Sequence, residues 1–278
     1  MTVDVERRPR ATRGRSGRGG VRVIAHRGAS SIAPENTLAA IRLAIAGGLD
    51  LVEVDVQRSR DGELFLMHDT TLVRTTDVRQ VFPDRRAPWL LSDFSSEEIR
   101  RLDAGSWLSP EYAGERVPTL AEALAVVRSS AAGLQLELKA PALYPGLATG
   151  VAEQVKTAPG WAGTPAATEQ LLVQSFSREA VQEFSAAAPG TPVGLLGMPA
   201  RTDLAGLSTW VDQVNPSHHL VSAGYVDAVH RAGMECVVWT VNREASMHRV
   251  ARLGVDGIIT DRPEMMQRVL RDREDDAA

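Results

Sequence analysis

The sequence predicts an α/β protein with the architecture of a (β/α)8 TIM barrel that carries a small insertion after the third strand-like run. Short apolar runs alternate with amphipathic segments along about 250 residues, which is typical of parallel strands covered by their connecting helices. Polar residues collect where these runs end, as in barrel active sites. The main alternative is a doubly wound open sheet. The first run, however, is followed by AHRGAS and not by a G-x-G-x-x-G phosphate loop.

The composition fits a soluble protein with a large core. Of the 278 residues, 44% are apolar and 24% are charged. A net charge of −4 favours neither nucleic acid nor an anionic membrane as a partner, so we expect a small-molecule substrate. The single cysteine, Cys236, cannot form an intramolecular disulfide, and we predict a cytoplasmic location and no transmembrane segment.

The two ends of the chain differ in composition from the rest. Residues 1–20 are rich in Arg and Gly and lack the apolar core of a secretory signal, so we predict a disordered basic arm. Residues 273–278 form an acidic tail. We therefore place the barrel domain at residues 21–272, with residues 70–118 as its inserted segment.

The first strand and the first helix have clear signals. Val21–Ala25 is a short apolar run and predicts a buried strand. Pro34–Thr37 then opens an amphipathic helix, which Asn36 or Thr37 can cap, and a Gly-Gly pair ends it.

The next strand carries two acids. The alternation in Leu51–Val56 places Glu53 and Asp55 on one face and three valines on the other. Asp61-Gly62 indicates a tight turn before a third run, Leu64–Met67, which leaves no room for a helix. Because the chain then has nine strand-like runs for the eight positions of a barrel, we expect an irregular connection here.

The periodicity fades from Thr70 to Pro118, where prolines and tryptophans are scattered, with a short helical piece near Ser96–Leu102. We interpret this segment as an insertion over one end of the domain. A helix capped by Thr119 and ending at Arg128 restarts the alternation. The later strands are expected at Leu134–Lys139, Leu171–Gln174, Val193–Leu196, Asp212–Val214, Cys236–Val241 and Gly257–Thr260. The later helices are expected at Leu147–Val155, Arg178–Ala186, Ala223–Arg231, Glu244–Leu253 and after Pro263.

Three acids are predicted to face one axis. Glu53 and Asp55 share a strand face, and Glu137 lies on the inward face of a later strand. Carboxylates on a strand are usually solvated, but here the alternate apolar residues must face the helices, so the acids point inward, where an unpartnered charge is costly. A divalent cation resolves their repulsion, and Mg²⁺ or Ca²⁺ suits an oxygen-only site.

Two basic side chains and two histidines complete the predicted site. A cation together with Arg27 and Lys139 forms a positive pocket, whose natural guest is a phosphate ester. His26 and His68 each follow an apolar run. Either histidine alone would more often be structural, but together they can take a proton from an attacking hydroxyl and give one to a leaving oxygen. The residue types therefore predict phosphodiester hydrolysis.

A series of short motifs runs in order through residues 21–270. The motifs are His26-Arg27-Gly28, Pro34-Glu35-Asn36-Thr37, Glu53-x-Asp55, Asp61-Gly62, His68-Asp69, Leu72-x-Arg74-Thr75-Thr76, Leu102-Asp103-Ala104-Gly105-Ser106-Trp107, Val117-Pro118-Thr119-Leu120-x-Glu122, Leu136-Glu137-Leu138-Lys139, Ser175-Phe176, Trp239-Thr240-Val241-Asn242 and Gly257-Ile258-Ile259-Thr260-Asp261-x-Pro263. This series resembles the glycerophosphodiester phosphodiesterase family, whose two-histidine chemistry is similar to that of the phosphatidylinositol phospholipases C.

The resemblance implies a TIM-type barrel that hydrolyses a glycerophosphodiester to an alcohol and glycerol 3-phosphate. It leaves open whether water or the substrate's own glycerol hydroxyl attacks first. One departure is Val78, where the family often has glycine after the preceding turn, so the insertion is expected to differ in shape. The implied roles are acid/base catalysis by His26 and His68, metal binding by Glu53, Asp55 and Glu137, phosphate binding by Arg27 and Lys139, an apolar wall from Trp239, and support of the site by Glu35 and Ser175.

Three other functions are alternatives to this one. The same chemistry on lysophospholipids would be favoured by an apolar patch at Trp89–Leu91 and Trp107. A catalytically silent phosphate-binding barrel would typically have lost an acid or a histidine, and none is lost here. A barrel lyase that stabilises a metal-bound enolate would leave His68 and Arg27 without a role. The sequence leaves the oligomeric state open.

Overall fold

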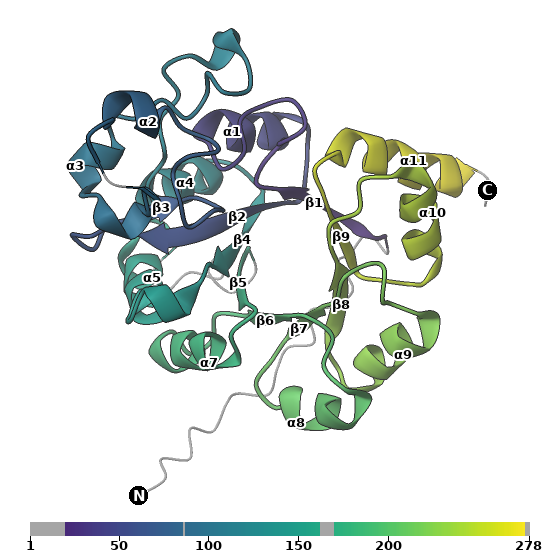
Figure 1. The fold of residues 1–278 in the computed structure, drawn as a ribbon. Coiled ribbons are helices and arrows are strands. Elements are labelled where there is room, and N and C mark those ends of the chain that lie inside the picture. The colour runs from purple at the N-terminus through teal and green to yellow at the C-terminus, as the bar shows by residue number, and fades with distance from the viewer. Residues whose placement is uncertain (1–19, 86, 162–169, 276–278) are drawn as a thin grey trace, which may run out of the picture.

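The protein is a closed barrel of eight parallel strands, in a computed structural model that describes residues 20–85, 87–161 and 170–275 (Figure 1). The barrel closes because β1 pairs in parallel with both β2 and β9. The predicted fold class is therefore confirmed. Residues 1–19 of the predicted arm and 276–278 of the predicted tail lie outside the described residues. The barrel strands are β1 Arg22–His26, β2 Leu51–Arg58, β4 Gly133–Leu138, β5 Leu171–Ser175, β6 Val193–Leu196, β7 Gln213–Asn215, β8 Glu235–Val238 and β9 Gly257–Thr260.

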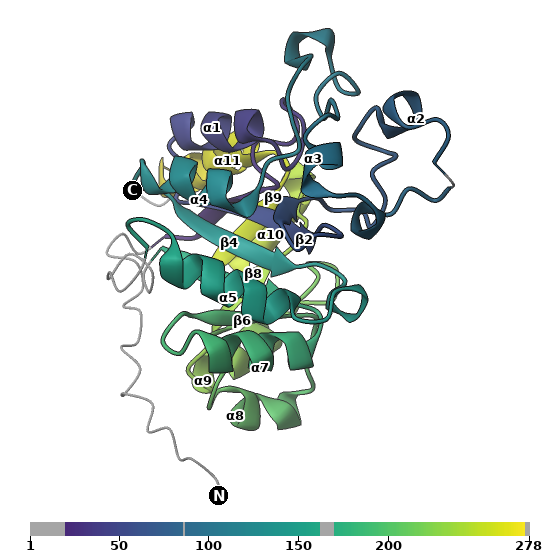
Figure 2. The same ribbon diagram turned by 90° about the vertical axis from the view of Figure 1, so that its left-hand side faces the viewer.

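Helices surround the barrel (Figures 1 and 2). The short α8 helix was not predicted, and α11 runs into the segment where an acidic tail was expected. Within the described residues, no helix has the length and hydropathy needed to cross a bilayer. The helices that connect the strands are α1 Leu38–Ala46, α4 Leu120–Arg128, α5 Leu147–Thr157, α7 Arg178–Ala187, α8 Leu204–Leu207, α9 Ala223–Arg231, α10 Glu244–Arg252 and α11 Pro263–Asp275.

One strand-like run more than a barrel needs was predicted, and the extra strand, β3, lies outside the barrel. β3, Leu64–Leu66, pairs antiparallel with the last three residues of β2. The predicted irregular connection is thus a hairpin, closed by a hydrogen bond from Ser59 N to Glu63 O (2.9 Å). The prediction that β2 ends at Val56 is wrong, because the strand continues past its barrel partner β4 to pair with β3.

The insertion after β3 has its own small core and projects from one end of the barrel (Figure 2). It contains two short helices, α2 Val78–Val81 and α3 Ser96–Ile99. Val78, the departure from the family pattern, is fully buried in this core at the start of α2. Leu91 is also fully buried here, so the apolar stretch near it packs the insertion.

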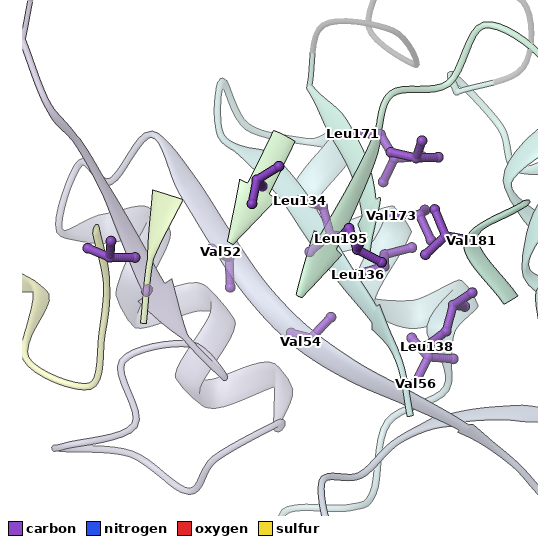
Figure 3. Packing of buried hydrophobic residues seen from close by; sticks show 14 of the residues in the cluster. Val52, Val54, Val56, Leu134, Leu136, Leu138, Leu171, Val173, Val181 and Leu195 are labelled. Carbon is purple, nitrogen blue, oxygen red and sulfur yellow. The ribbon is translucent and has the colours of Figure 1, made fainter. Parts of the chain in front are cut away.

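Along β2 and β4, apolar and polar side chains alternate, so that one face of these strands belongs to the hydrophobic core and the other to the site. Val52, Val54 and Val56 face outward and pack with apolar residues of β4 and β5 and with Val181 of α7 (Figure 3). This is the face that helices cover in a parallel barrel. The other face of the same strands, with its acids, therefore points into the barrel.

Candidate active site

Three carboxylates from β2 and β4 meet inside the barrel. Glu53, Asp55 and Glu137 each place a carboxylate oxygen within 4.8 Å of the other two. Asp55 stands opposite Glu137 in the pairing of the two strands, and Glu53 lies two residues earlier on the same face. All three side chains are buried. The structure therefore brings together the three acids that the alternation placed on one axis.

Burial and mutual repulsion perturb the three carboxyl groups. Burial, then Asp55 and Glu137, raises the pKa of Glu53 well above its usual value. Burial, followed by Asp55, raises the pKa of Glu137 to about 7. Burial also opposes ionisation of Asp55, but Lys139 and Arg27 outweigh it and lower the pKa of Asp55 to about 2. Lys139 and Arg27 thus favour the ionised form of Asp55, but they do not offset the burial and repulsion that raise the pKa of Glu53 and Glu137.

The two predicted basic residues touch this cluster directly. Lys139 Nζ lies 2.7 Å from Glu137 Oε1 and 3.1 Å from Asp55 Oδ1. Arg27 Nε lies 3.3 Å from Asp55 Oδ2, and the Arg27 backbone N–H donates to Glu53 Oε2 over 3.1 Å. The backbone of Arg27 is left-handed, with φ 59°. In this turn both the side chain of Arg27 and its backbone N–H point to the acids. The next residue must be glycine, since a Cβ on Gly28 would lie 2.6 Å from a backbone carbon of α1.

His26 is paired with a carboxylate from the end of β9. Its Nδ1 lies 2.5 Å from Asp261 Oδ1. Asp261 is fixed in turn by Asn242 Nδ2, 2.5 Å from its other oxygen, and by Ser30 Oγ. A carboxylate at Nδ1 orients the ring and leaves Nε2 for a reacting group.

His68 has an equivalent partner that lies next to it in sequence. Its Nδ1 lies 2.7 Å from Asp69 Oδ1. Arg74 donates from Nε to Asp69 Oδ2 over 2.7 Å and from both terminal nitrogens to Glu35, each over 2.7 Å. Glu35 also accepts from Arg27 Nη1 over 2.8 Å. Burial lowers the pKa of His68 more than Asp55 and Asp69 raise it, which favours the neutral ring.

Asn36 holds the acid cluster and does not cap α1. Thr37 is the cap, since its Oγ1 accepts from Ala40 N over 3.2 Å. The Asn36 amide instead donates to Asp55 Oδ2 over 2.8 Å and accepts from Asp55 N over 3.1 Å. Of the two capping options read from the sequence, the one at Asn36 is therefore wrong.

Two further predicted residues lie at the ends of later strands. Trp239 follows β8, and its Nε1 donates to Asn215 O over 2.7 Å. Its ring meets Phe176 edge to face at 5.5 Å, and Phe176 is 55% exposed, so these aromatics form an apolar edge of the barrel mouth. Ser175 is buried, and its Oγ donates to Leu138 O over 2.9 Å, next to Lys139.

Sequence reasoning missed the residues that hold the site together. Their signals were present, because each stands inside one of the short motifs, and two of them directly follow a chosen residue, Glu35 or His68. Their partners depend on how loops fold back on the barrel, which periodicity does not describe. The missed residues are Asn36, Asp69, Arg74, Asn242 and Asp261.

The acid cluster fits a divalent cation. Asp55 Oδ1 is buried and accepts no hydrogen bond within the described part of the chain, although Lys139 lies near it. The three acids offer oxygen atoms alone, which Mg²⁺ and Ca²⁺ prefer. A cation here would also relieve the repulsion that raises the pKa of Glu53 and Glu137.

A (β/α)8 barrel with this buried acid cluster, two cationic side chains and two carboxylate-paired histidines has the groups that an enzyme acting on phosphate esters needs. Comparison with known proteins agrees, since residues 26–265 match the Glycerophosphoryl diester phosphodiesterase family. The chain belongs to this family, and it is a phosphodiesterase enzyme.

Relatives of this chain cover nearly its whole length. It is 33% identical over 253 residues to a glycerophosphodiester phosphodiesterase of Caldanaerobacter subterraneus subsp. tengcongensis, over 90% of this chain and 97% of that protein. It is 32% identical over 260 residues to one of Bacillus subtilis, over 88% and 85%. A solved Oleispira antarctica phosphodiesterase, in complex with the product sn-glycerol-3-phosphate, has a TM-score of 0.78 at 32% identity, over 90% and 96%.

Proposed function

We propose that this enzyme hydrolyses glycerophosphodiesters to an alcohol and glycerol 3-phosphate, with Mg²⁺ or Ca²⁺ as its cofactor. The buried acid cluster, with Arg27 and Lys139 against it, carries the proposal, because this arrangement suits a cation and a phosphate together. The Oleispira antarctica enzyme, whose product is sn-glycerol-3-phosphate, supports this substrate class.

Glu53, Asp55 and Glu137 would hold the cation. When bound, it would supply positive charge that offsets charge developing on the phosphoryl oxygens. Arg27 and Lys139 would bind the non-bridging oxygens from the same side, since both already lie against the acids. Trp239 would pack against the apolar side of the glycerol or of the leaving alcohol.

His26 and His68 would exchange protons with the substrate through Nε2, since each holds a carboxylate at Nδ1. One would take the proton of the attacking hydroxyl and the other would protonate the leaving oxygen. Two routes fit: attack by water, or attack by the substrate's own glycerol hydroxyl through a cyclic phosphate. Phosphorus NMR during turnover distinguishes them, because only the second route forms the cyclic ester.

Glu35 and Ser175 would support the site without touching the substrate. Glu35 accepts hydrogen bonds from both Arg27 and Arg74 and so links the two side chains. Ser175 donates to the carbonyl of Leu138, at the end of β4 just before Lys139. Lysophospholipids are not favoured as substrates, because two of the residues that suggested an acyl site belong to the insertion core: Leu91 is fully buried and Trp89 packs against it, although Trp107 is 39% exposed. The cytoplasmic location stays a prediction.

Turnover on a panel of glycerophosphodiesters, measured as release of glycerol 3-phosphate with Mg²⁺, Ca²⁺ or EDTA, tests the proposal. We expect activity that requires one of the two cations. His26→Ala and Glu53→Ala should each lower kcat by at least about a hundredfold while the far-ultraviolet circular dichroism is kept. Near-wild-type rates for either variant, or full activity in EDTA, would show the assignment to be wrong.

A further inference from the structure

Gln57 is a buried polar residue of β2 that the proposed mechanism does not use. It is 0% exposed and lies on the strand face that also carries Glu53 and Asp55. We propose that Gln57 is a positioning residue: its side-chain amide holds the backbone that carries His68, and so sets the place of this histidine relative to the acid cluster. This inference rests on the proposed function, in which His68 exchanges a proton with the substrate.

The amide of Gln57 contacts three consecutive carbonyl groups. Its Nε2 donates to Met67 O over 2.7 Å, to His68 O over 3.1 Å and to Asp69 O over 2.8 Å. A primary amide has two N–H groups, so one of them is shared between two of these acceptors. The segment that carries His68 and its partner Asp69 is thereby tied at each of its residues to one side chain.

Tyr144 fixes the direction of this amide. Carbonyl oxygens can only accept, so the NH₂ end of Gln57 must face them, and Oε1 must point the other way. There Tyr144 donates its hydroxyl to Gln57 Oε1 over 2.7 Å. Burial raises the pKa of Tyr144 to about 12, so the hydroxyl keeps its proton at neutral pH and remains a donor.

The side chain of Gln57 binds the chain at the point where the backbone hydrogen bonds between β2 and β3 end. β3 ends at Leu66, and Met67 N makes the next backbone bond, to Asp55 O over 3.0 Å. From there the chain turns toward the site, and Gln57, two residues after Asp55, holds the next carbonyls. One strand therefore carries two acids of the cluster and the anchor of the histidine, so their relative placement is set by the spacing of alternate residues along β2.

This geometry predicts a loss in turnover more than in substrate binding. Arg27 and Lys139 stand on other segments and keep their contacts when the amide is removed. His68 keeps Asp69, but both belong to the segment that would be released. A catalytic group displaced by about 1 Å can cost a hundredfold in rate.

The test is a double-mutant cycle between Gln57→Met and His68→Ala. Methionine keeps the length of the side chain and removes its polar atoms. We expect Gln57→Met to lower kcat by about tenfold to a hundredfold with KM within about threefold of wild type. In the His68→Ala background, measured at high enzyme concentration, the same substitution should change kcat by less than about twofold, because its effect passes through the missing ring.

Tyr144→Phe is the second variant, since it removes the hydroxyl that orients the amide and keeps the packed ring. It should lower kcat by less than Gln57→Met, again without a further loss beside His68→Ala. Equal losses in both backgrounds, or a raised KM with unchanged kcat, would overturn the role of Gln57. Near-wild-type turnover of His68→Ala alone would instead overturn the proposed role of that histidine, which is a separate result. If Gln57→Met does not fold, Tyr144→Phe decides by the same criteria.

Discussion

At the scale of single residues, the two histidines are held in different ways. His26 is paired with Asp261, which is fixed by neutral donors. His68 is paired with Asp69, which is fixed by the charged Arg74. In these contacts, unlike those of Asp69, no arginine donates to the Asp261 carboxylate, which orients the ring of His26 through Nδ1.

Asp261→Asn tests this difference. The amide keeps the size of the side chain but removes the carboxylate that orients the ring of His26 and fixes its tautomer, so we expect kcat to fall by about tenfold to a thousandfold. The matched control is Asp256→Asn, because Asp256 pairs with His230 over 2.8 Å outside the site. Its kcat per folded enzyme should stay within about twofold of wild type. Equal kcat values for the two variants would contradict the role of Asp261.

Single residues also show how far the sequence can be read. The strand alternation was enough to place Glu53 and Asp55 inward, because period two allows two faces only. It could not assign Asn36 to Asp55, since that contact requires a left-handed backbone at Asn36, with φ 57°, within a loop. The same residue types would equally well cap a helix, so the choice depends on tertiary structure.

At the scale of elements, the least regular part of the chain is organised by one aspartate. In the insertion, Asp103 accepts hydrogen bonds from the backbone of Gly105, Ser106 and Gly114 over 2.6 to 2.8 Å. Burial alone would raise the pKa of Asp103, but these donors outweigh it and lower the pKa to about 2. The ionised form thus stabilises the folded insertion.

Asp103→Asn should therefore destabilise the fold in a pH-dependent way. The folded-state pKa lies below the usual value of 3.8, so the contribution of the ionised group is complete above about pH 4 and is lost as the pH falls from about 4 to 2. We expect a loss of about 1 to 3 kcal/mol in the free energy of unfolding at pH 6 and a smaller loss at pH 3. Urea unfolding followed by tryptophan fluorescence measures both.

Asp227→Asn is the matched control for this prediction, since Asp227 is exposed on α9. Its free energy of unfolding should stay within about 0.5 kcal/mol of wild type at both pH values. A loss at Asp103→Asn that is equal at pH 6 and pH 3 would show that the charge does not stabilise the insertion.

The strands show a second limit of sequence reading. The apolar run at β3 predicted a strand and the turn before it predicted a tight, irregular connection without a helix, and both are present. Which neighbour β3 would pair with, and that β2 would extend to Arg58 to reach it, did not follow from the run. Alternation fixes the face of a strand, whereas its partner depends on where the chain returns.

At the scale of the whole molecule, two parts of the barrel interior differ in polarity. One part is filled by the apolar side chains Ile24, Val237 and Ile259. Elsewhere the interior holds buried amides, where Gln174 Oε1 accepts from Gln135 and Asn215. The alternation of the strands correctly predicted the apolar side chains on the outer face of the sheet, because helices cover that face. It gave no reason to expect buried amides on the inner face. Gln174 Oε1 thus has two donors, whereas Asn215 Oδ1 and Gln213 Nε2, which are also buried, make no hydrogen bond within the described part of the chain.

The acid cluster also affects the stability of the whole molecule. Its acids repel one another in the native state, whereas they lie apart in the unfolded chain. A cation that binds the native site and not the unfolded chain stabilises the fold by mass action, by about 2.7 kcal/mol at a hundred times Kd. We therefore expect Mg²⁺ or Ca²⁺ to raise the Tm of the wild type by about 5 to 10 °C at that concentration, in thermal unfolding measured against an EDTA-treated sample.

Glu53→Gln separates this effect from a general effect of salt. Glutamine removes one repelling charge, so in EDTA the variant should have a Tm at or above that of the wild type, since the pKa of Glu53 is already raised by burial and its two neighbours. It also removes one ligand, so the added cation should raise its Tm by less than half of the wild-type shift. Na⁺ at equal ionic strength should move neither protein. An equal shift in both proteins would mean that the cation stabilises the fold from another place, and the metal assignment of the cluster would then be wrong.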